Sequence, residues 1–367
     1  MQQMCMLLVG ALLIYLAVVK ECEPNLLLAM GFGTIIANLP WSPVAALVGT
    51  TLGGEHGGAL TILFNAGIAN ELFPLLIFVA IGAMCDFTPL LANPKMFVFG
   101  FTAQAGIFLA WAIAYLTGYF DVKEAAAIGI IGAADGPTAI YVANRFAQRL
   151  MGPISVAAYT YMAAVPIIQP PVVKLLTTKK ERMIRMAYVQ REVPKKYLIL
   201  FPLGITVVAG LIASASVALI GFLMFGNLLR VSGVTDRLSQ AAQNELANIV
   251  TILLGLAISQ KMTGAEFANP MTLVILALGV VAFALDTAGG VITAKVWNIF
   301  LPEGHKINPI VGAAGISAFP MAARVAQKLG QDADKGNFLL MHAIGANVAG
   351  QIGSVVCGGI VLMLLGG

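Results

Sequence analysis

The sequence predicts an all-α, polytopic membrane protein with an inverted-repeat, transporter-like fold and broken, discontinuous helices. The first observation is composition: 59% of the 367 residues are apolar, 10% are charged and the mean hydropathy is +0.90. Soluble domains carry about 25% charged residues, so this chain lacks the charges for a water-facing surface. The second observation is an internal duplication, and the third is the presence of glycine and proline at matching places in both copies.

Long runs without charge recur along the chain, and several reach the roughly 20 residues that a membrane-spanning helix needs. They occupy 96–120, 125–144 (apart from Asp135), 197–229, 307–323 and 336–367. The segment from Met1 to Val19 is apolar and lacks both a basic leader and a small-residue cleavage site. This pattern favours a first membrane helix over a removable signal. We therefore interpret residues 1–69 as N-terminal membrane helices.

Three segments of the first half recur in the second half, in the same order. The matches are "NELFPLLIFVAIGA" from Asn70 with "NELANIVTILLGLA" from Asn244, "ANP" ending at Pro94 and at Pro270, and "GIIGAADGPTAIYVA" (129–143) with "GAAGISAFPMAARVA" (312–326). The offsets grow slowly, from 174 to 176 to 183 residues. One match has little weight in so apolar a chain, but three in order indicate a duplication. We assign 70–171 to the first repeat and 244–367 to the second, with 197–243 as a connecting membrane helix.

A basic segment divides the two repeats. "VVKLLTTKKERMIRMAYVQREVPKK" (172–196) holds eight of the 21 Lys and Arg residues and two Glu. Short basic loops beside membrane helices stay in the cytoplasm, so we expect this loop to face inside. Binding of anionic lipid or of an acidic partner is a further reading of the same charges.

Asp135 is the only charged residue between Glu124 and Arg145, and it lies beside the helix breakers Gly136 and Pro137. A charge at bilayer depth costs roughly 2.5 kcal/mol or more, so it normally faces a cavity and has a function. Broken backbone is tolerated at that depth only where it lines a cavity or packs within protein. The plainer reading is that Asp135 caps a half-helix starting at Pro137, and the two roles are compatible.

The matching break in the second repeat offers neutral oxygens and free carbonyls. Its candidates are Asn308, Ser317 and the backbone around Gly312, and the last apolar run adds Asn347. Together with Asp135 they form a set of hard oxygen ligands that suits Na⁺ or a similar cation, with no His or Cys to favour zinc. Taken singly, Asn308 and Ser317 also fit packing or capping roles.

Three further residues lie close to these breaks in the sequence. Tyr159 and Tyr161 follow the first break; such tyrosines are often interfacial anchors, whereas a phenol inside a cavity relays protons. Arg324 lies one helical turn beyond Pro320 and carries a permanent charge.

Three segments closely resemble the β subunits of the sodium-pumping, biotin-dependent decarboxylases of oxaloacetate, methylmalonyl-CoA and glutaconyl-CoA. They are "GIIGAADGPTAIYVANR" (129–145), "AAYTYMAAVPIIQPP" (157–171) and "NPIVGAAGISAFPMAARVAQK" (308–328). The likeness covers nearly the whole chain. The chain is short beside the oxaloacetate type, which favours an acyl-CoA enzyme.

The resemblance implies the following activity. A soluble carboxyltransferase α subunit moves a carboxyl group onto biotin on a carrier subunit, and the β subunit decarboxylates carboxybiotin, consumes a proton and exports Na⁺. The chain has no Met-Lys-Met biotin-attachment motif, so the carrier must be a partner. The resemblance also implies a small membrane subunit, a homotrimer of this chain, and a location in the bacterial inner membrane.

The resemblance also implies site roles, residue by residue. Asp135, Asn308, Ser317 and Asn347 would bind Na⁺, with Gly312 supporting the break. Asp135 and Tyr161 would take part in catalysis and in handling the proton or cation, with Tyr159 beside them at the cofactor. Arg324 would bind the carboxylate of carboxybiotin.

Two other functions fit the residues without the resemblance. A Na⁺-coupled secondary carboxylate transporter would show the same duplication, breaks and oxygen cluster. A non-catalytic membrane anchor for a soluble enzyme would leave Asp135 and Arg324 without a role at membrane depth.

Overall fold

The structure is a computed structural model that describes residues 2–21, 23–40, 42–47, 56–187, 192–267 and 269–366. Every regular element within these residues is helical. Six helices are long and apolar enough to cross a membrane, and up to eight spans result if each of two bent helix pairs counts as one. The prediction of an all-α, multi-pass membrane protein with interrupted helices is therefore confirmed.

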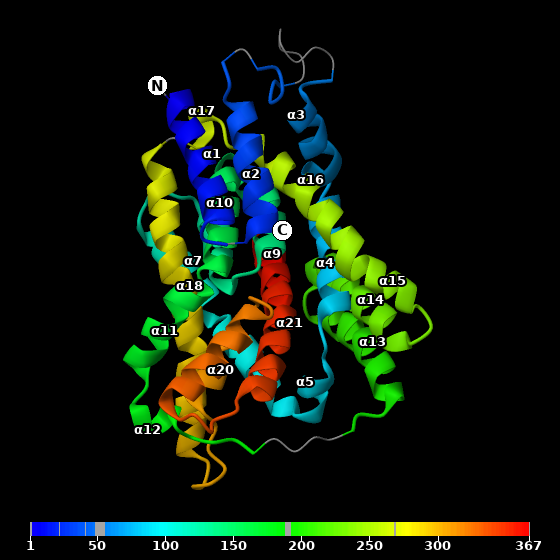
Figure 1. Cartoon of the computed structure of the whole chain (residues 1–367), viewed down its shortest axis with the longest axis vertical. Helices are drawn as coiled ribbons and strands as arrows, with labels where there is room; N and C mark the ends of the chain where they lie inside the picture. Colours follow the sequence, from blue (N-terminus) through cyan, green and yellow to red (C-terminus); the bar gives the residue numbers. More distant parts are fainter. Residues whose placement is uncertain are drawn as a thin grey trace.

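The elements of the first part of the chain precede the basic loop (Figure 1). They are α1 (Gln2–Val18), α2 (Pro24–Ala37), α3 (Ala59–Phe64), the π-helical turn η1 (Asn65–Ala69), α4 (Leu72–Met84), α5 (Thr88–Ala92), η2 (Pro94–Met96), α6 (Phe97–Ala103), α7 (Ala105–Leu116), α8 (Val122–Gly129), η3 (Ile130–Ala133), α9 (Gly136–Phe146), η4 (Gln148–Leu150), α10 (Met151–Ala163) and α11 (Val165–Leu176).

The remaining elements lie within the basic loop or follow it. They are α12 (Lys179–Arg182), α13 (Lys195–Ile212), η5 (Ser214–Ser216), α14 (Val217–Ser232), α15 (Asp236–Ala241), the π-helical turn η6 (Ala242–Leu246), α16 (Ala247–Ser259), α17 (Gly264–Phe267), α18 (Pro270–Ile299), α19 (Pro309–Ala313), α20 (Met321–Ala333) and α21 (Leu340–Leu365).

One group of helices combines the first part of the chain with its middle part. The α1–α2 hairpin packs against α16, and the α13–α14 hairpin packs against α4 through α14. Helices α4 and α14 cross very closely, because a Cβ atom at Gly82 would lie 1.8 Å from the carbonyl oxygen of Leu223. A Cβ atom at Gly226 would lie 2.0 Å from the carbonyl oxygen of Val79. Glycine is therefore required on both sides of this crossing.

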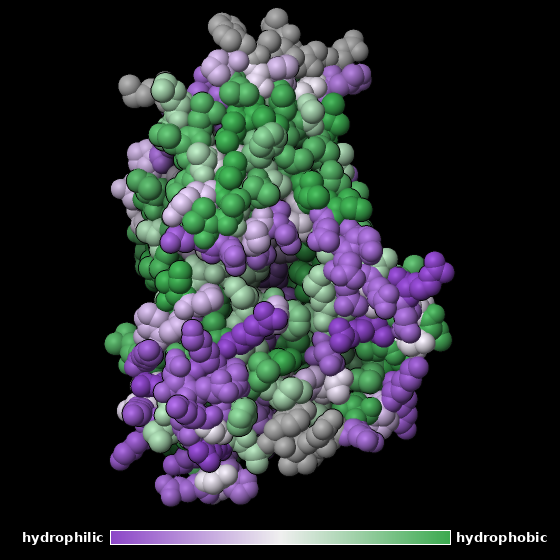
Figure 2. Space-filling model, viewed as in Figure 1, coloured by the Kyte–Doolittle hydropathy of each residue, from purple (hydrophilic) through white to green (hydrophobic). Residues whose placement is uncertain are grey.

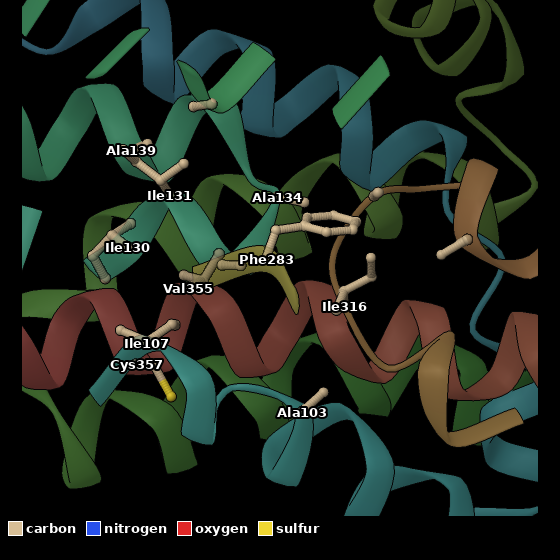
Figure 3. Packing of buried hydrophobic residues seen from close by; sticks show 14 of the residues in the cluster. Ala103, Ile107, Ile130, Ile131, Ala134, Ala139, Phe283, Ile316, Val355 and Cys357 are labelled. Atoms are coloured by element: carbon tan, nitrogen blue, oxygen red, sulfur yellow. The ribbon is translucent and has the colours of Figure 1, made fainter. Parts of the chain in front are cut away.

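A second group contains the interrupted helices and surrounds α18 and α21. Helix α18 packs against α6, α7, α10, α11, α19 and η3, and α21 packs against α5, α6 and α20. Figure 3 shows apolar side chains filling this region, with Ala134 and Ile316 from the two breaks near Phe283 of α18. Most of α21 is buried in this group, so it is an internal support for both breaks.

The surface agrees with a membrane location. Large apolar side chains are exposed on the outer helices, for example Leu8 (73%), Leu211 (83%) and Ile299 (77%). Figure 2 shows hydrophobic residues covering the surface over α1, α2 and α16, and hydrophilic residues gathered over α12 and α20 at the lower end. Exposed leucine and isoleucine of this size are stable against lipid rather than water.

The segment predicted as the basic loop, 172–196, is partly helical. Helix α11 continues to Leu176, α12 follows within the loop, and residues 188–191 lie outside the described part of the chain. The backbone after α12 is held by the second half: the side-chain amides of Asn308 and Asn337 each donate to the carbonyl oxygens of Arg182 and Ile184. These bonds fix one end of the loop against the start of α19 and the segment after α20.

An ion pair continues this attachment. Nε of Arg185 lies 2.6 Å from Oδ2 of Asp334, and a second guanidinium nitrogen lies 3.0 Å from Oδ1. The hydrogen bond from Arg185 lowers the pKa of Asp334. The carboxylate therefore keeps its charge, and the pair persists, until the pH falls below the ordinary aspartate range of about 3.9.

Replacing Asp334 by asparagine is expected to loosen the loop without unfolding the protein. An exposed ion pair contributes about 0.2–1 kcal/mol, so trypsin should cleave after Arg182 and Arg185 up to about fivefold faster. Asp332→Asn is the matched control, because Asp332 is exposed on the same helix and forms no ion pair within the described residues. Equal cleavage rates in both variants would mean that the pair does not hold the loop.

The stretch 197–243 differs from the single connecting helix that we expected. It holds two long helices, α13 and α14, followed by the short α15. The break falls at "ASAS" (213–216), where the hydroxyl of Ser216 donates to the carbonyl oxygen of Ala213 at 2.7 Å. Local serine bonds of this kind compete with helix continuation, so one long uncharged run becomes a hairpin.

Candidate cation-binding site

The first break lies between η3 and α9. Helix α8 starts with a capping box, in which Asp121 accepts bonds from the amides of Lys123 and Glu124. The helix ends through η3 at Ala134, which has a left-handed φ of 54°. Asp135 follows in extended conformation and caps α9, which has Pro137 in its first turn. This confirms the plainer reading of Asp135 as a helix cap.

Asp135 is 3% exposed, and its carboxylate accepts bonds only from neutral groups. The hydroxyls of Thr138 and Ser354 each lie 2.7 Å from Oδ2, and the amide of Thr138 lies 3.4 Å from Oδ1. No Lys, Arg or His within the described residues forms an ion pair with it. A buried carboxylate without a cationic side chain leaves its charge available for a bound cation.

The second break meets the first directly. Residues 314–320 separate α19 from α20, and the amide of Ser317 donates to the carbonyl oxygen of Ala133 at 3.0 Å. The hydroxyl of Ser317 lies 3.4 Å from the carbonyl oxygen of Gly350 on α21. The two segments that resemble each other in sequence therefore lie side by side. The residue that accepts this bond, Ala133, precedes Asp135 by two residues.

Helix α21 turns a polar face toward both breaks. Asn347, Gln351 and Ser354 lie on this face; Asn347 donates to the carbonyl oxygen of Ile316 at 2.7 Å and Gln351 donates to that of Ser317. The amide oxygens of Asn347 and Gln351 are buried and accept no hydrogen bond from any residue that the structure describes. Gln351 lines the same cavity as Asp135, and a buried, unpartnered oxygen near a carboxylate is what a hard cation binds.

Gln351 was not among the residues predicted from the sequence. It follows Asn347 by four residues, the spacing that places two side chains on one helix face. That spacing is the signal that would have found it.

Some of these polar side chains line one cavity of about 220 Å³. Asp135, Ser317, Gln351, Tyr159 and Phe319 line it from the group with the interrupted helices. The opposite wall comes from α4, α16 and the α1–α2 turn. None of the described residues that line it is basic, so the cavity favours a cation.

The two tyrosines lie in different surroundings. Tyr159 lines the cavity, and its ring covers Gly136, where a Cβ atom would lie 2.3 Å from the ring carbon Cζ. Tyr161 faces α18, and its hydroxyl donates to the carbonyl oxygen of Leu276 at 2.5 Å. Tyr159 is therefore the one beside Asp135.

Asn308 and Gly312 lie outside the cavity lining. The side chain of Asn308 caps α19 through a bond from the amide of Ile310 at 3.0 Å, and its amide group holds the loop carbonyls described above. Gly312 lies against Gly290 of α18, where a Cβ atom would be 2.1 Å from the carbonyl oxygen. In this arrangement both residues position α19, and direct contact with a cation remains a prediction for them.

Arg324 is exposed on α20, and its guanidinium has no ion-pair partner among the described residues. The buried face of α20 consists of small and apolar side chains such as Ala322, Ala323 and Val325. Arg324 therefore offers its charge to solvent, one turn beyond the break that carries Ser317. It is free to bind an anion that arrives from outside the helix group.

Removing either unpartnered amide oxygen is expected to weaken cation binding. Asn347→Ala and Gln351→Ala should each raise the Na⁺ concentration for half-maximal activity about tenfold, the effect of losing one bond to a charged group. Asn144→Ala is the matched control, because Asn144 is a buried amide with an unpartnered oxygen on α9 outside this cavity. A Na⁺ titration in which all three variants match the parent protein would exclude α21 from the site.

Comparisons with known proteins show the family of this chain. Residues 2–365 match the family model described as the Na⁺-transporting oxaloacetate decarboxylase beta subunit. The chain is 50% identical to the glutaconyl-CoA decarboxylase subunit beta of Acidaminococcus fermentans, covering 99% of this chain and 93% of that protein. It is 47% identical to the methylmalonyl-CoA decarboxylase subunit beta of Propionigenium modestum (100% and 95%) and 45% identical to the oxaloacetate decarboxylase beta chain of Klebsiella pneumoniae (98% and 94%).

The family match spans both breaks and α21, so the helices that carry Asp135, Ser317 and Asn347 all lie within it. Relatives with three different acids in their names match over almost their full lengths. The chain belongs to the family of Na⁺-transporting decarboxylase β subunits, and it is a Na⁺-translocating enzyme subunit of the membrane.

Proposed function

We propose that this chain decarboxylates carboxybiotin presented by a partner subunit, consumes a proton, and couples the release of CO₂ to Na⁺ export. The observation that carries the proposal is the buried carboxylate of Asp135 at the meeting point of two broken helices, in one cavity with Gln351, whose amide oxygen is unpartnered among the described residues. The family membership favours this function over a Na⁺-coupled carboxylate transporter, which the geometry alone accommodates equally well.

In this proposal Na⁺ is the cargo, and Asp135 supplies the charge that offsets its dehydration. Ser317, Asn347 and Gln351 supply neutral oxygens, while Asn308 and Gly312 hold α19 and the backbone of the second break. Tyr159 closes the cavity over Asp135. Tyr161 has a hydroxyl that is already polarised by a carbonyl oxygen, which suits a part in handling the proton.

Arg324 would bind the carboxylate of carboxybiotin. Its planar, permanently charged guanidinium can donate two parallel hydrogen bonds to a carboxylate. Its exposed position on α20 can be reached by a biotin arm from outside this chain. Biotin itself is supplied by another chain, since this sequence has no attachment motif.

We also propose that 70–171 and 244–367 are inverted repeats. A π-helical turn precedes both α4 and α16, and Asn70 and Asn244 each donate to the carbonyl four residues earlier, at 2.8 and 2.9 Å. The packing is reciprocal, with α2 on α16 and α14 on α4. Opposite directions are supported by Figure 1, in which α1 starts near the top and α13 near the bottom. These features support a two-fold axis in the membrane plane.

The proposed partners are a soluble carboxyltransferase α subunit, a biotin carrier and a small membrane subunit, with this chain as a homotrimer. Arg185 of the basic segment is paired with Asp334 at the end of α20. If the segment is cytoplasmic, as its charges favour, this end of α20 faces the soluble partners and Arg324 is within their reach. The corresponding location is the bacterial inner membrane.

For the acid, we propose an acyl-CoA-type complex. Alignments to the glutaconyl-CoA and methylmalonyl-CoA relatives span 362 and 381 positions, whereas those to the oxaloacetate relatives span 411, so the latter carry insertions. The acid itself binds to another subunit.

Reconstitution of the complex in vesicles tests the function. Carboxybiotin should release CO₂ faster when Na⁺ is present, and ²²Na⁺ should accumulate inside inverted vesicles. Carboxylate uptake without CO₂ release would identify a transporter instead. Release of CO₂ without Na⁺ movement would contradict the coupling.

A further inference from the structure

Helix α18 carries a second buried carboxylate that the site described above does not use. Asp286 is 0% exposed, and neither of its carboxylate oxygens has a hydrogen-bond partner within the described residues. It forms no ion pair there either. An uncompensated carboxylate at this depth is costly, so it must be neutralised or have a function.

Asp286 is wedged between two backbones. A Cβ atom at Gly106 would lie 2.3 Å from Oδ1, and one at Gly132 would lie 2.8 Å from Oδ2. Gly106 is in the first turn of α7, and Gly132 belongs to η3, three residues before Asp135. The carboxyl group therefore sits between the start of a twelve-residue helix and the first break.

The surroundings suit a proton better than a metal cation. Complete burial favours the neutral, protonated carboxyl group. The backbone amides of Gly106 and Ile107 face it from the positive end of α7, which disfavours a metal cation there.

Two routes connect Asp286 to Asp135. The first is the backbone of η3 from Gly132. The second runs along α21, where Cys357 lies within electrostatic range of Asp286, one turn beyond the Ser354 that donates to Asp135. Asp286 is thus joined to the Asp135 break by direct contact with η3, and Asp135 is held by the same helix, α21, that carries Cys357.

The titratable groups on elements packed against α18 are few. They are Lys123 and Glu124 on α8, Tyr115 on α7, Tyr159 and Tyr161 on α10 and Lys174 on α11. Glu124 is already paired with Arg149. Asp135 lies two residues beyond η3, which packs against α18, and this carboxylate forms no ion pair within the described residues.

We propose that Asp286 is a proton-binding site that exchanges its proton against a cation at Asp135. As Na⁺ binds at Asp135, the O–H bond of the Asp286 carboxyl breaks, its electron pair stays on the carboxylate, and the proton leaves to water. One positive charge enters and one leaves, so the charge of the membrane core stays constant. This inference rests on the proposed function only in taking Asp135 as the cation site.

Proton release on addition of Na⁺ tests the exchange directly. The purified complex in weakly buffered detergent solution receives NaCl, with choline chloride as the blank, and a pH indicator counts the protons. The parent protein should release about one proton for each Na⁺ bound. Asp286→Asn should release fewer, bind Na⁺ about fivefold or more weakly, and lose part of the pH dependence of Na⁺ affinity, since asparagine mimics the protonated form.

Thr293→Val is the matched control, because it removes a hydroxyl from the same helix two turns further on without changing charge, and it should behave like the parent protein. If Asp286→Asn lowers only the melting temperature and leaves proton release unchanged, Asp286 is a cap for α7 and the inference is overturned. If the Asp286→Asn variant does not fold, the same measurement is made on Asp286→Ser. Sodium binding that survives Asp135→Asn would instead overturn the proposed site, so the two failures are distinguishable.

Discussion

Replacing Asp135 by asparagine is expected to abolish Na⁺-dependent decarboxylation while the protein still folds. Asparagine keeps the size of the side chain and one oxygen for the donors at Thr138 and Ser354. It removes a charge that, at about 4 Å and an effective dielectric of 20, stabilises a bound cation by about 4 kcal/mol. Such a loss corresponds to about a 1000-fold weaker affinity, to be measured as Na⁺ binding by the purified complex.

The control for this variant is Ser354→Ala, which removes a donor but keeps the carboxylate. It is expected to change Na⁺ affinity by less than about tenfold, because a neutral donor to a carboxylate contributes about 1.5–3 kcal/mol at most, shared here with Thr138. If Asp135→Asn keeps its Na⁺ dependence, the cation binds elsewhere.

Arg324→Ala should stop the turnover of carboxybiotin and leave Na⁺ binding intact or tighter. The guanidinium lies one turn beyond the break that carries Ser317, and it has no carboxylate partner among the described residues. While unpaired, it repels a cation at the break; an arriving carboxylate cancels this repulsion and loss of CO₂ restores it. Decarboxylation would then weaken Na⁺ binding and favour release.

Two variants isolate this effect. Lys328→Ala removes a positive charge from the next turn of the exposed face of α20 and should retain most activity. Arg324→Lys keeps the charge but loses the planar fork, so it should bind carboxybiotin weakly and turn it over slowly. A collapse of Na⁺ affinity together with turnover in Arg324→Ala would show that the residue maintains the shape of the site.

The breaks were predictable because their causes are local. Gly132, Gly136 and Pro137 disfavour a continuous helix whatever surrounds them, and Pro320 does the same in the second half. Their proximity was suggested by the matching sequence patterns. The bond from the amide of Ser317 to the carbonyl of Ala133 joins them in space.

Other parts of the site depend on contacts between residues that are far apart in the sequence, and a local sequence pattern does not predict such contacts. Asn308 was expected at the cation, but its amide binds loop carbonyls more than a hundred residues away in the chain. Gln351 looked like an ordinary residue of an apolar helix until its oxygen proved to be unpartnered. Asp286 was passed over in the sequence, because a single carboxylate in a long helix shows its isolation only once its neighbours are known.

The exchanged pairing of α2 with α16 and of α4 with α14 has a consequence for how the protein is made. Helix α4 enters the membrane long before α14 is synthesised, and its glycine-lined groove at Gly82 has no partner until then. The first half must therefore wait in the bilayer, exposed to insertion chaperones and membrane proteases, until the second half arrives. A gene split within 188–191 should yield two fragments that are each degraded when expressed alone and that survive only when co-expressed.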